Sequence, residues 1–283
     1  MLTTNGKTHI KRYLAGQVPA IAQSIAFGIG SKAESATDTY LQFEVGRSDI
    51  VLTSFDFVNN KLIFKAPVAE EYAGQILEVA LFSTATNPEA GDYGSRLIST
   101  FDSDSEEWVN LADGTDEVFL TNASRIGGDS LSHTPAASSL RTSSLPGLFL
   151  DFSGNSGADK FIFALNVGNA NTASVTFKFL TDASNYYAFT ITSPSAGYTI
   201  VERTMSVAAV TGAPNWANIT EIQVTTTASS GGAAAVDFDG IRIEDTDSIS
   251  PNYVMVSREL LSVPFIKTIG MSQDIEFALD VNV

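Results

Sequence analysis

The 283-residue sequence contains no cysteine and only two histidines, His9 and His133. The absence of cysteine excludes structural disulfides and thiolate metal sites. The two histidines have no clustered ligand residues around them, so the sequence does not predict a histidine-based metal centre. No Gly-x-Ser-x-Gly motif accompanies them. We therefore expect His9 in a helix and His133 in a serine-rich surface loop, without a serine triad.

Basic residues are also scarce, because 16 Lys and Arg stand against 32 Asp and Glu, giving a formal net charge of −16. Nucleic acids and anionic membranes both need a basic surface on their protein partner. We therefore expect no nucleic-acid partner. No apolar run approaches the ~18 residues of a membrane span, so we expect no membrane insertion either.

The N-terminal segment lacks the apolar stretch that follows the basic residues of a secretory signal, although it carries Lys7, Lys11 and Arg12. We therefore expect no such signal there. The protein would stay in the cell that makes it, or leave that cell inside an assembled particle.

One short helix is predicted near the start of the chain. Ile10, Tyr13 and Leu14 are spaced at i, i+3 and i+4, which places them on one face of a helix. Thr3 or Thr4 can cap its first turn. Most of the remaining sequence alternates apolar and polar residues, as in DIEFALDV (274–281), and this alternation is typical of strands.

The composition changes near residue 84 and again in the segment 245–253. The region between is rich in Ser, Thr, Ala and Gly, and its evenly spaced short strands predict a β-sandwich. The strands after residue 248 are too few to form a stable domain alone. We therefore predict a discontinuous β-domain, residues 1–96 and 248–283, with a second β-domain, 97–247, inserted in its exposed 84–95 loop. A linear string of two or three domains is the alternative.

Two acidic stretches, FDSDSEEWVN (101–110) and VDFDGIRIED (236–245), carry the acids that stand out most. In the second stretch the apolar positions change from even to odd numbers at Gly240. A β-bulge at this glycine would keep all four apolar side chains in the core and place Asp237 and Asp239 on the outer face. The four apolar residues are Val236, Phe238, Ile241 and Ile243.

These stretches resemble the jelly-roll type of carbohydrate-binding module. The family's first strand carries a Phe…Trp pattern, a Trp precedes a later Ile- and Val-containing strand, and the last strand often has the form Val-x-Phe-Asp-x-Ile. The resemblance covers roughly 97–247 and implies a jelly-roll fold, with Phe101 and Trp108 in its core. The matching residues are Phe101, Trp108, Trp216, Ile219, Ile222, Val224, Phe238, Asp239 and Ile241.

The resemblance also implies a structural Ca²⁺, because many such modules hold one between the first and last strands. Calcium binds six to eight oxygen atoms, some of them backbone carbonyls. Asp102, Asp104 and Asp239 are the candidate side-chain ligands. The alternative is that these carboxylates are solvated charges at strand ends.

A sugar-binding surface would need exposed aromatic rings that form a flat platform. The candidates are Tyr186, Tyr187, Tyr198 and Trp216. The alternative is that most of these rings pack in the core or at its rim. Consecutive strand residues point to opposite faces, so one ring of the Tyr186–Tyr187 pair is expected to be exposed in either case.

We do not predict an enzyme. Glycoside hydrolysis needs two carboxylates at a fixed separation across a cleft, one of them with a raised pKa. A strand-face row of acids beside serines offers no burial that would raise a pKa.

The N-terminal region resembles the start of certain tailed-phage virion proteins. These have a short helix, a strand ending in Gly-x-Gly, and a Thr-Asp-x-x-Leu-x-x-Glu-x-x-Arg stretch. The resemblance covers about 50 residues and implies a tail-fibre, minor-tail, neck or head-decoration component. Glu44 and Arg47 lie three apart in an extended segment, so we expect them not to share a strand face. The matching residues are Gly28, Gly30, Thr37, Asp38, Leu41, Glu44 and Arg47.

Taken together, the sequence predicts an all-β protein: a β-sandwich docking domain with one short N-terminal helix and an inserted jelly roll. We predict a non-enzymatic structural component of a phage virion, a capsid-decoration, head-fibre or tail appendage. Its partners would be other virion proteins and further copies of itself, and the jelly roll could contact a host glycan. The alternatives are a carbohydrate-binding module of a bacterial surface or secreted protein, and an enzyme acting on host polysaccharide.

Overall fold

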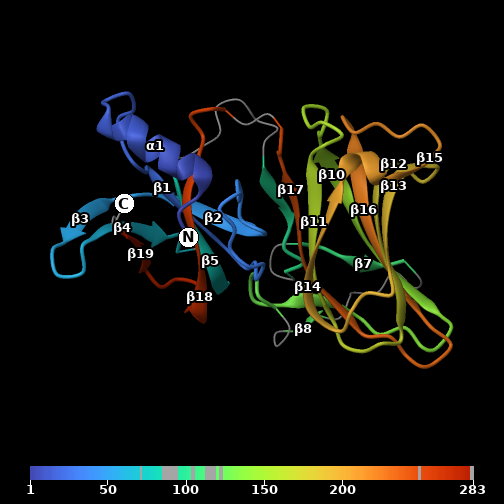
Figure 1. The fold of residues 1–283 in the computed structure, drawn as a ribbon. Coiled ribbons are helices and arrows are strands. Elements are labelled where there is room, and N and C mark those ends of the chain that lie inside the picture. Colours follow the sequence, from blue (N-terminus) through green and yellow to red (C-terminus); the bar gives the residue numbers. More distant parts are fainter. Residues whose placement is uncertain are drawn as a thin grey trace. The chain divides into compact units, whose positions relative to one another are not determined.

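The computed structural model describes residues 1–70, 72–84, 95–102, 106–111, 119–120, 124–247 and 250–280 (Figure 1). It is an all-β protein with one α-helix in these described segments. The chain divides into two compact units, which are described separately below. Unit 1 comprises Met1–Glu89 and Ile249–Val283, and unit 2 comprises Ala90–Ser248.

Unit 1 contains a four-stranded antiparallel sheet in the order β18-β5-β1-β2 and a three-stranded one in the order β19-β4-β3. Phe27 and Val79 of the first sheet pack with Phe64 and Phe277 of the second in one core, so the two sheets form a sandwich. The elements are α1 (Thr4–Leu14), β1 (Ser24–Gly28), β2 (Glu44–Asp49), β3 (Leu52–Asp56), β4 (Lys61–Val68), β5 (Gly74–Phe82), β18 (Met255–Lys267) and β19 (Gln273–Asp280).

Helix α1 begins where predicted, with the Thr3 hydroxyl accepting a hydrogen bond from the Gly6 amide at 2.8 Å. Its buried face is not the predicted stripe, because Leu14 is 78 % exposed while Gly6 and His9 are buried. A Cβ atom at position 6 would lie 2.0 Å from the Val256 carbonyl oxygen. The glycine therefore lets the helix backbone lie directly on β18. No described helix is long and apolar enough to cross a membrane.

Glu44 and Arg47 pair with each other on β2, with 2.8 Å between Arg47 Nη2 and Glu44 Oε2, contrary to the expectation from their spacing. The reason is a bulge against β1: Phe27 lies opposite Gly46 and Gly28 lies opposite Glu44, so one residue of β2 is extra. This bulge turns the two side chains to the same side. The guanidinium also lies 3.9 Å over the Phe82 ring.

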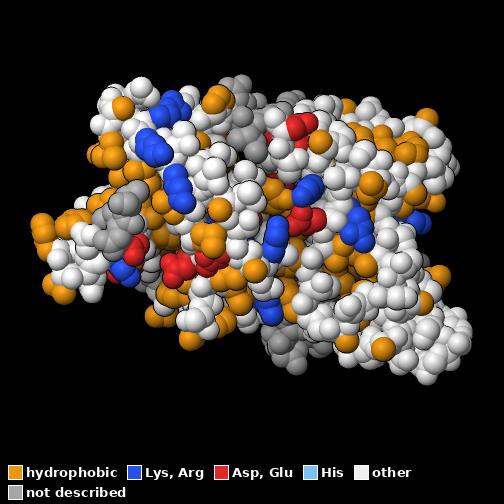
Figure 2. All heavy atoms as spheres, viewed as in Figure 1, with side chains coloured by type: hydrophobic (Ala, Val, Ile, Leu, Met, Phe, Trp, Pro, Cys, Tyr) orange, Lys and Arg blue, Asp and Glu red, His pale blue; other side chains and the backbone are white. Residues whose placement is uncertain are grey.

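The β3–β4 hairpin carries exposed apolar side chains, including Phe57 at 87 % and Val58 at 92 % exposure. Figure 2 shows such side chains at the end of this hairpin, and Phe55 and Phe57 contact each other edge to face at 4.9 Å. The homo-oligomerisation expected from the sequence stays a prediction, and this hairpin is the surface of unit 1 at which to test it.

Unit 2 is a jelly-roll β-sandwich of two antiparallel sheets (Figure 1). The front sheet has the order β15-β13-β12-β16-β10-β7, and the back sheet has the order β14-β11-β17-β9-β8, with β6 also paired to β17. The strands are β6 (Arg96–Ser99), β7 (Val109–Asn110), β8 (Phe119–Leu120), β9 (Ser130–His133), β10 (Leu140–Leu150), β11 (Lys160–Val167), β12 (Thr172–Asp182), β13 (Asn185–Thr192), β14 (Gly197–Thr204), β15 (Ala209–Thr211), β16 (Ile219–Ala228) and β17 (Val236–Glu244).

The core of unit 2 is rich in phenylalanine. Phe163 of the back sheet stacks on Phe177 of the front sheet with ring centroids 4.0 Å apart. Phe101 and Trp108 are also in this core, as predicted, and stack on each other at 4.6 Å. FDSDSEEWVN is not one continuous strand, however. Phe101 has a φ of +56°, which breaks extended structure, and of the described residues here only Val109 and Asn110 form a strand.

The predicted β-bulge in β17 is confirmed. Ala164 lies opposite Gly240 and Leu165 lies opposite Phe238, so Asp239 is the extra residue. All four apolar side chains of VDFDGIRIED are fully buried, as expected. The Asp239 carboxylate is fully buried rather than solvated. It is covered by hydrogen-bond donors, described below, from the segment 124–126 and from Tyr198.

Candidate functional site

The outer face of the front sheet is a regular array of short polar side chains. The registers of β10, β16, β12 and β13 place four threonines side by side in one row across the sheet. Within this row Thr142 and Thr225 are hydrogen-bonded at 2.9 Å, and Thr176 and Thr190 at 3.1 Å. The next row is Ser144, Gln223, Lys178 and Ala188. The threonines, Ser144 and Ala188 have small side chains, and this leaves space above the sheet.

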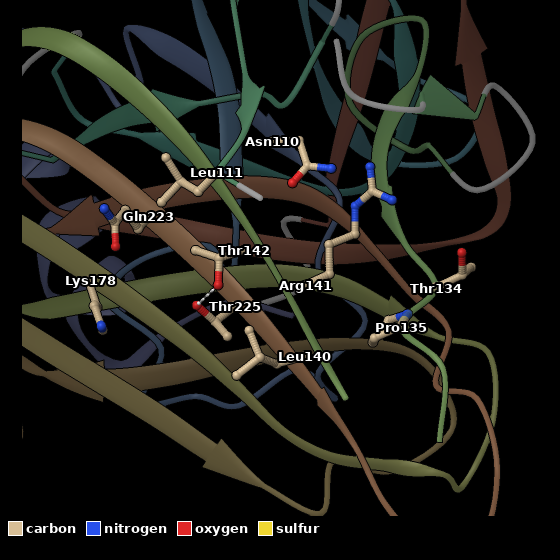
Figure 3. A pocket seen from close by; sticks show the side chains of 10 residues that line it. All are labelled: Asn110, Leu111, Thr134, Pro135, Leu140, Arg141, Thr142, Lys178, Gln223 and Thr225. Carbon is tan, nitrogen blue, oxygen red and sulfur yellow. Dashed lines mark hydrogen bonds between the residues drawn. The ribbon is translucent and has the colours of Figure 1, made fainter. Parts of the chain in front are cut away.

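A pocket of about 510 Å³ opens over this array (Figure 3). Its floor includes Thr142 and Thr225, which point toward each other in Figure 3. Apolar side chains of Leu111, Leu140 and Pro135 contribute part of the wall. The remaining lining residues are Asn110, Thr134, Arg141, Lys178 and Gln223.

A hydrogen-bond network fixes the polar side chains beside the pocket. Glu221 Oε1 accepts hydrogen bonds from the Ser144 hydroxyl and from Gln223 Nε2, the latter at 2.6 Å. The amide nitrogen of Gln223 is thereby directed to Glu221, so its carbonyl oxygen is the atom that a ligand hydroxyl can reach. Gln223 is positioned before any ligand arrives, which lowers the entropy lost on binding.

The structure does not bring the four predicted aromatic residues together. Tyr187 and Trp216 stack face to face at 3.7 Å, and Trp216 packs against the phenylalanine core. Tyr198 lies on the back sheet, where the Arg125 guanidinium covers its ring at 3.7 Å. Tyr186 extends from the outer face of the front sheet, near the pocket. The predicted platform is therefore not present among these residues, because their rings contact one another or lie on different sheets.

The described candidates for calcium ligands do not fit a calcium site. Asp239 accepts hydrogen bonds from the Ser124 hydroxyl and from the amides of Arg125 and Ile126, the Arg125 one at 2.8 Å. Asp102 accepts one from the Gly128 amide at 2.7 Å. Donor hydrogens thus point at the oxygens that a cation would need. Both carboxylates hold the segment 124–128 instead, and Asp104 lies outside the described residues.

Asp239 also accepts a hydrogen bond from the Tyr198 hydroxyl. Burial raises the pKa of Asp239 to about 6, although the hydrogen bonds from Tyr198, Arg125 and Ile126 act in the opposite direction. The expectation that these acids lack the burial needed to raise a pKa is therefore wrong for this residue.

Sequence analysis missed an acidic cluster of unit 2, formed by Asp159, Asp245 and Asp247. One carboxylate oxygen from each lies within 4.8 Å of the others. Asp159 accepts hydrogen bonds from the amides of Ser156 and Thr246, at 2.9 and 2.8 Å, and so ties two loops together. The Asp-Thr-Asp spacing in 245–247 was the available signal, but Asp159 lies far away in sequence.

Removing divalent cations is expected to leave the thermal unfolding of unit 2 unchanged, because the described carboxylates already accept protein hydrogen bonds. An ion present at 100 times its Kd would add about 2.7 kcal/mol, which corresponds to roughly 5–10 °C in a domain of this size. The measurement is tryptophan-fluorescence melting with EDTA and with excess Ca²⁺. A fall of several degrees in EDTA would contradict the expectation, and Asp245→Asn would then show whether the acidic cluster holds the ion.

His133 is in β9 and fully buried, not in the surface loop predicted for it. Its Nδ1 lies 3.1 Å from the Thr226 hydroxyl and its Nε2 contacts the Ser143 hydroxyl. Burial, with a smaller effect of Arg141, lowers the pKa of His133 to about 3. The imidazole is therefore neutral and part of the core.

No family model matches the sequence, and no curated protein matches it. Among solved structures, a family 11 carbohydrate-binding module from Clostridium thermocellum, in complex with a β-1,3-1,4-mixed-linked tetrasaccharide, has a TM-score of 0.42 and 14 % identity, covering 55 % of this chain and 98 % of its own. A carbohydrate-binding module specific for non-crystalline cellulose has a TM-score of 0.35 and 13 % identity, covering 54 % and 97 %. These values are too low to carry a function. None of the comparisons supports a resemblance to phage virion proteins.

Proposed function

We propose that the chain is a non-enzymatic glycan-binding protein that holds a saccharide in the front-sheet pocket of unit 2. The observation that carries this proposal is the pocket itself, whose volume of about 510 Å³ lies within the range of small-molecule sites. It is built on rigid strands whose side chains are already held by hydrogen bonds.

The chemistry of the lining suits a sugar. A saccharide ring presents hydroxyl groups at its edges and C–H groups on its faces. Asn110 and the threonine hydroxyls can donate to and accept from the hydroxyl groups, and the Gln223 carbonyl oxygen can accept from them. Leu111 and Leu140 can cover the C–H faces. The proposed ligand is therefore a short stretch of polysaccharide lying across the strands.

The absence of a reaction is part of the proposal. A glycosidase needs two carboxylates about 5–9.5 Å apart across the scissile bond. No acidic residue is among the described residues that line the pocket. The acid on the same sheet face, Glu221, has Oε1 engaged by Ser144 and Gln223.

The role of unit 1 stays a prediction from the sequence. Docking to a tailed-phage particle, contact with other virion proteins, homo-oligomerisation and a virion location rest on the resemblance of the N-terminal region. A carbohydrate-binding module of a bacterial surface or secreted protein would use the same pocket. Co-purification of the chain with virions, at a fixed copy number, distinguishes the two.

Replacing Thr142 and Thr225 together by valine is expected to weaken saccharide binding by more than tenfold. Each hydroxyl that loses a ligand hydrogen bond costs about 1 kcal/mol, or roughly fivefold in Kd. The ligand would be found by glycan-array screening of the full chain and its Kd measured by calorimetry.

Thr192→Val is the matched control, because Thr192 is an exposed front-sheet residue that does not line the pocket. Its Kd should equal that of the unchanged protein. If the double variant binds the saccharide as tightly as the unchanged protein, the pocket is not the binding site.

A further inference from the structure

We infer that the front-sheet pocket selects acidic saccharides, those carrying a carboxylate or sulfate group, through Lys178. This inference rests on the proposed function, because it names the class of saccharide bound at the same site.

Lys178 is a cation without an acidic partner in an acidic protein. It lies on β12, opposite Gln223 of β16 on one side and Ala188 of β13 on the other. It forms no ion pair with any residue in the described segments. Two other strand cations of unit 2 do have acidic partners: Lys160 pairs with Glu202 at 2.8 Å and Arg242 with Glu244 at 2.9 Å.

The Lys178 ammonium is held near the pocket by an aromatic ring. Its Nζ lies 4.7 Å from the centroid of the Tyr186 ring, a cation–π contact that needs no acid. The charge is therefore positioned but not neutralised. An anionic group of a ligand would supply the missing partner.

The described lining of the pocket includes basic but no acidic side chains, although the chain carries twice as many acids as bases. Of its described lining residues, the two ionisable ones are Lys178 and Arg141. Figure 3 shows them on different sides of the pocket, with the Thr142–Thr225 pair between. These basic side chains attract an anionic group of a ligand. They do not interfere with hydrogen bonds to its neutral hydroxyl groups.

The rest of the lining favours an acidic sugar over other anions. A nucleic acid would bring many phosphates against a chain of net charge −16. A sugar acid brings one charge for Lys178 and several hydroxyl groups for Gln223 and the threonines. A pocket of this size can hold a ligand that makes both kinds of contact.

The test uses matched ligands that differ only in charge. Oligogalacturonate is compared with its methyl ester, and a sulfated galactan oligosaccharide with its desulfated form, by calorimetry on the full chain. We expect about two- to fivefold tighter binding of at least one acidic member than of its neutral counterpart, the range of a partly exposed ion pair. The preference should decline as salt is raised. The two ligand pairs show whether carboxylate or sulfate is recognised.

Lys178→Met should abolish this preference by weakening binding of the acidic member, while Lys178→Arg should retain it. Lys7→Met is the control, because it removes the same charge from an exposed position on α1 in unit 1. Equal binding of acidic and neutral members by the unchanged protein overturns the charge selection and leaves glycan binding intact. Absence of binding to every saccharide, including on the array, overturns both. If Lys178→Met still prefers the acidic member, Lys178 is not the cause of the preference.

Discussion

Replacing Glu78 by alanine is expected to lower the free energy of unfolding of unit 1 by about 3–5 kcal/mol, because it breaks a buried ion pair and leaves Arg258 with Asp38 as its one acidic partner among the described residues. Arg258 is only 1 % exposed and its Nη2 lies 2.8 Å from Glu78 Oε2. The same carboxylate accepts hydrogen bonds from the amides of Gly30 and Phe43, at 3.0 and 2.9 Å. Its removal therefore also releases the segment between β1 and β2.

The measurement is calorimetric unfolding of the full chain. Both tryptophans lie in unit 2, at positions 108 and 216, so the transition of unit 1 is the one without a tryptophan-fluorescence change. Glu276→Ala is the control, since Glu276 is 64 % exposed and 3.8 Å from Lys65; a surface pair is worth about 0–1 kcal/mol.

The double variant Glu78→Leu/Arg258→Met should recover part of the loss, because both charges of this pair are then absent, while Asp38 loses the guanidinium that lies 2.7 Å from it. A loss below about 1 kcal/mol in Glu78→Ala, where about 3–5 kcal/mol is expected for a broken buried pair, would contradict the account of this pair.

The stability of unit 2 is expected to respond to pH through two buried groups that act in opposite directions. Asp239 has a pKa raised to about 6 in the folded protein, so the fold binds its proton more tightly than the unfolded chain does. Its contribution to stability is greatest at low pH and is lost as pH rises through 6. His133 has a pKa lowered to about 3, so the unfolded chain takes up its proton first. Its contribution is present above pH 6.5 and is lost as pH falls.

The unchanged protein should therefore show a shallow pH dependence between about pH 4 and 6, since the two contributions cancel there. His133→Gln should leave the effect of Asp239 and make unit 2 more stable on acidification. Asp239→Asn should leave the effect of His133 and make unit 2 less stable on acidification. Each of these slopes is up to about 1.4 kcal/mol per pH unit.

These slopes are measured by urea unfolding followed by tryptophan fluorescence. Subtracting the values of the unchanged protein from those of each variant removes the contribution of exposed acids. If the free energy of unfolding depends on pH in the same way in all three proteins, the proposed opposing effects of Asp239 and His133 are wrong. If Asp239→Asn does not fold, His133→Gln alone decides the question.

The sequence contained the information for the local features of the fold. The change of apolar parity at Gly240 predicted the β17 bulge, because it depends on neighbouring residues only. Phe101 and Trp108, the two aromatic residues of FDSDSEEWVN, were predicted to be in the core. The all-β class followed from the alternation of apolar and polar residues along most of the chain.

The candidate site could not be predicted in the same way, because it depends on strand register between distant segments. Thr142 and Thr225 form the pocket floor only when β10 pairs with β16 in the observed register. The same limit explains the aromatic residues: local sequence does not show that Tyr187 would stack on Trp216. It also explains the burial of Asp239, which is covered by donors of the segment 124–126, more than a hundred residues earlier.

The central claim is that the front sheet binds saccharide, and a crystal structure of the full chain with the best array ligand tests it most directly. The account predicts density for a sugar above Thr225, with hydroxyl groups within hydrogen-bond distance of Gln223 and Thr142. Density on the back sheet or on unit 1, with an empty front-sheet pocket, would contradict it.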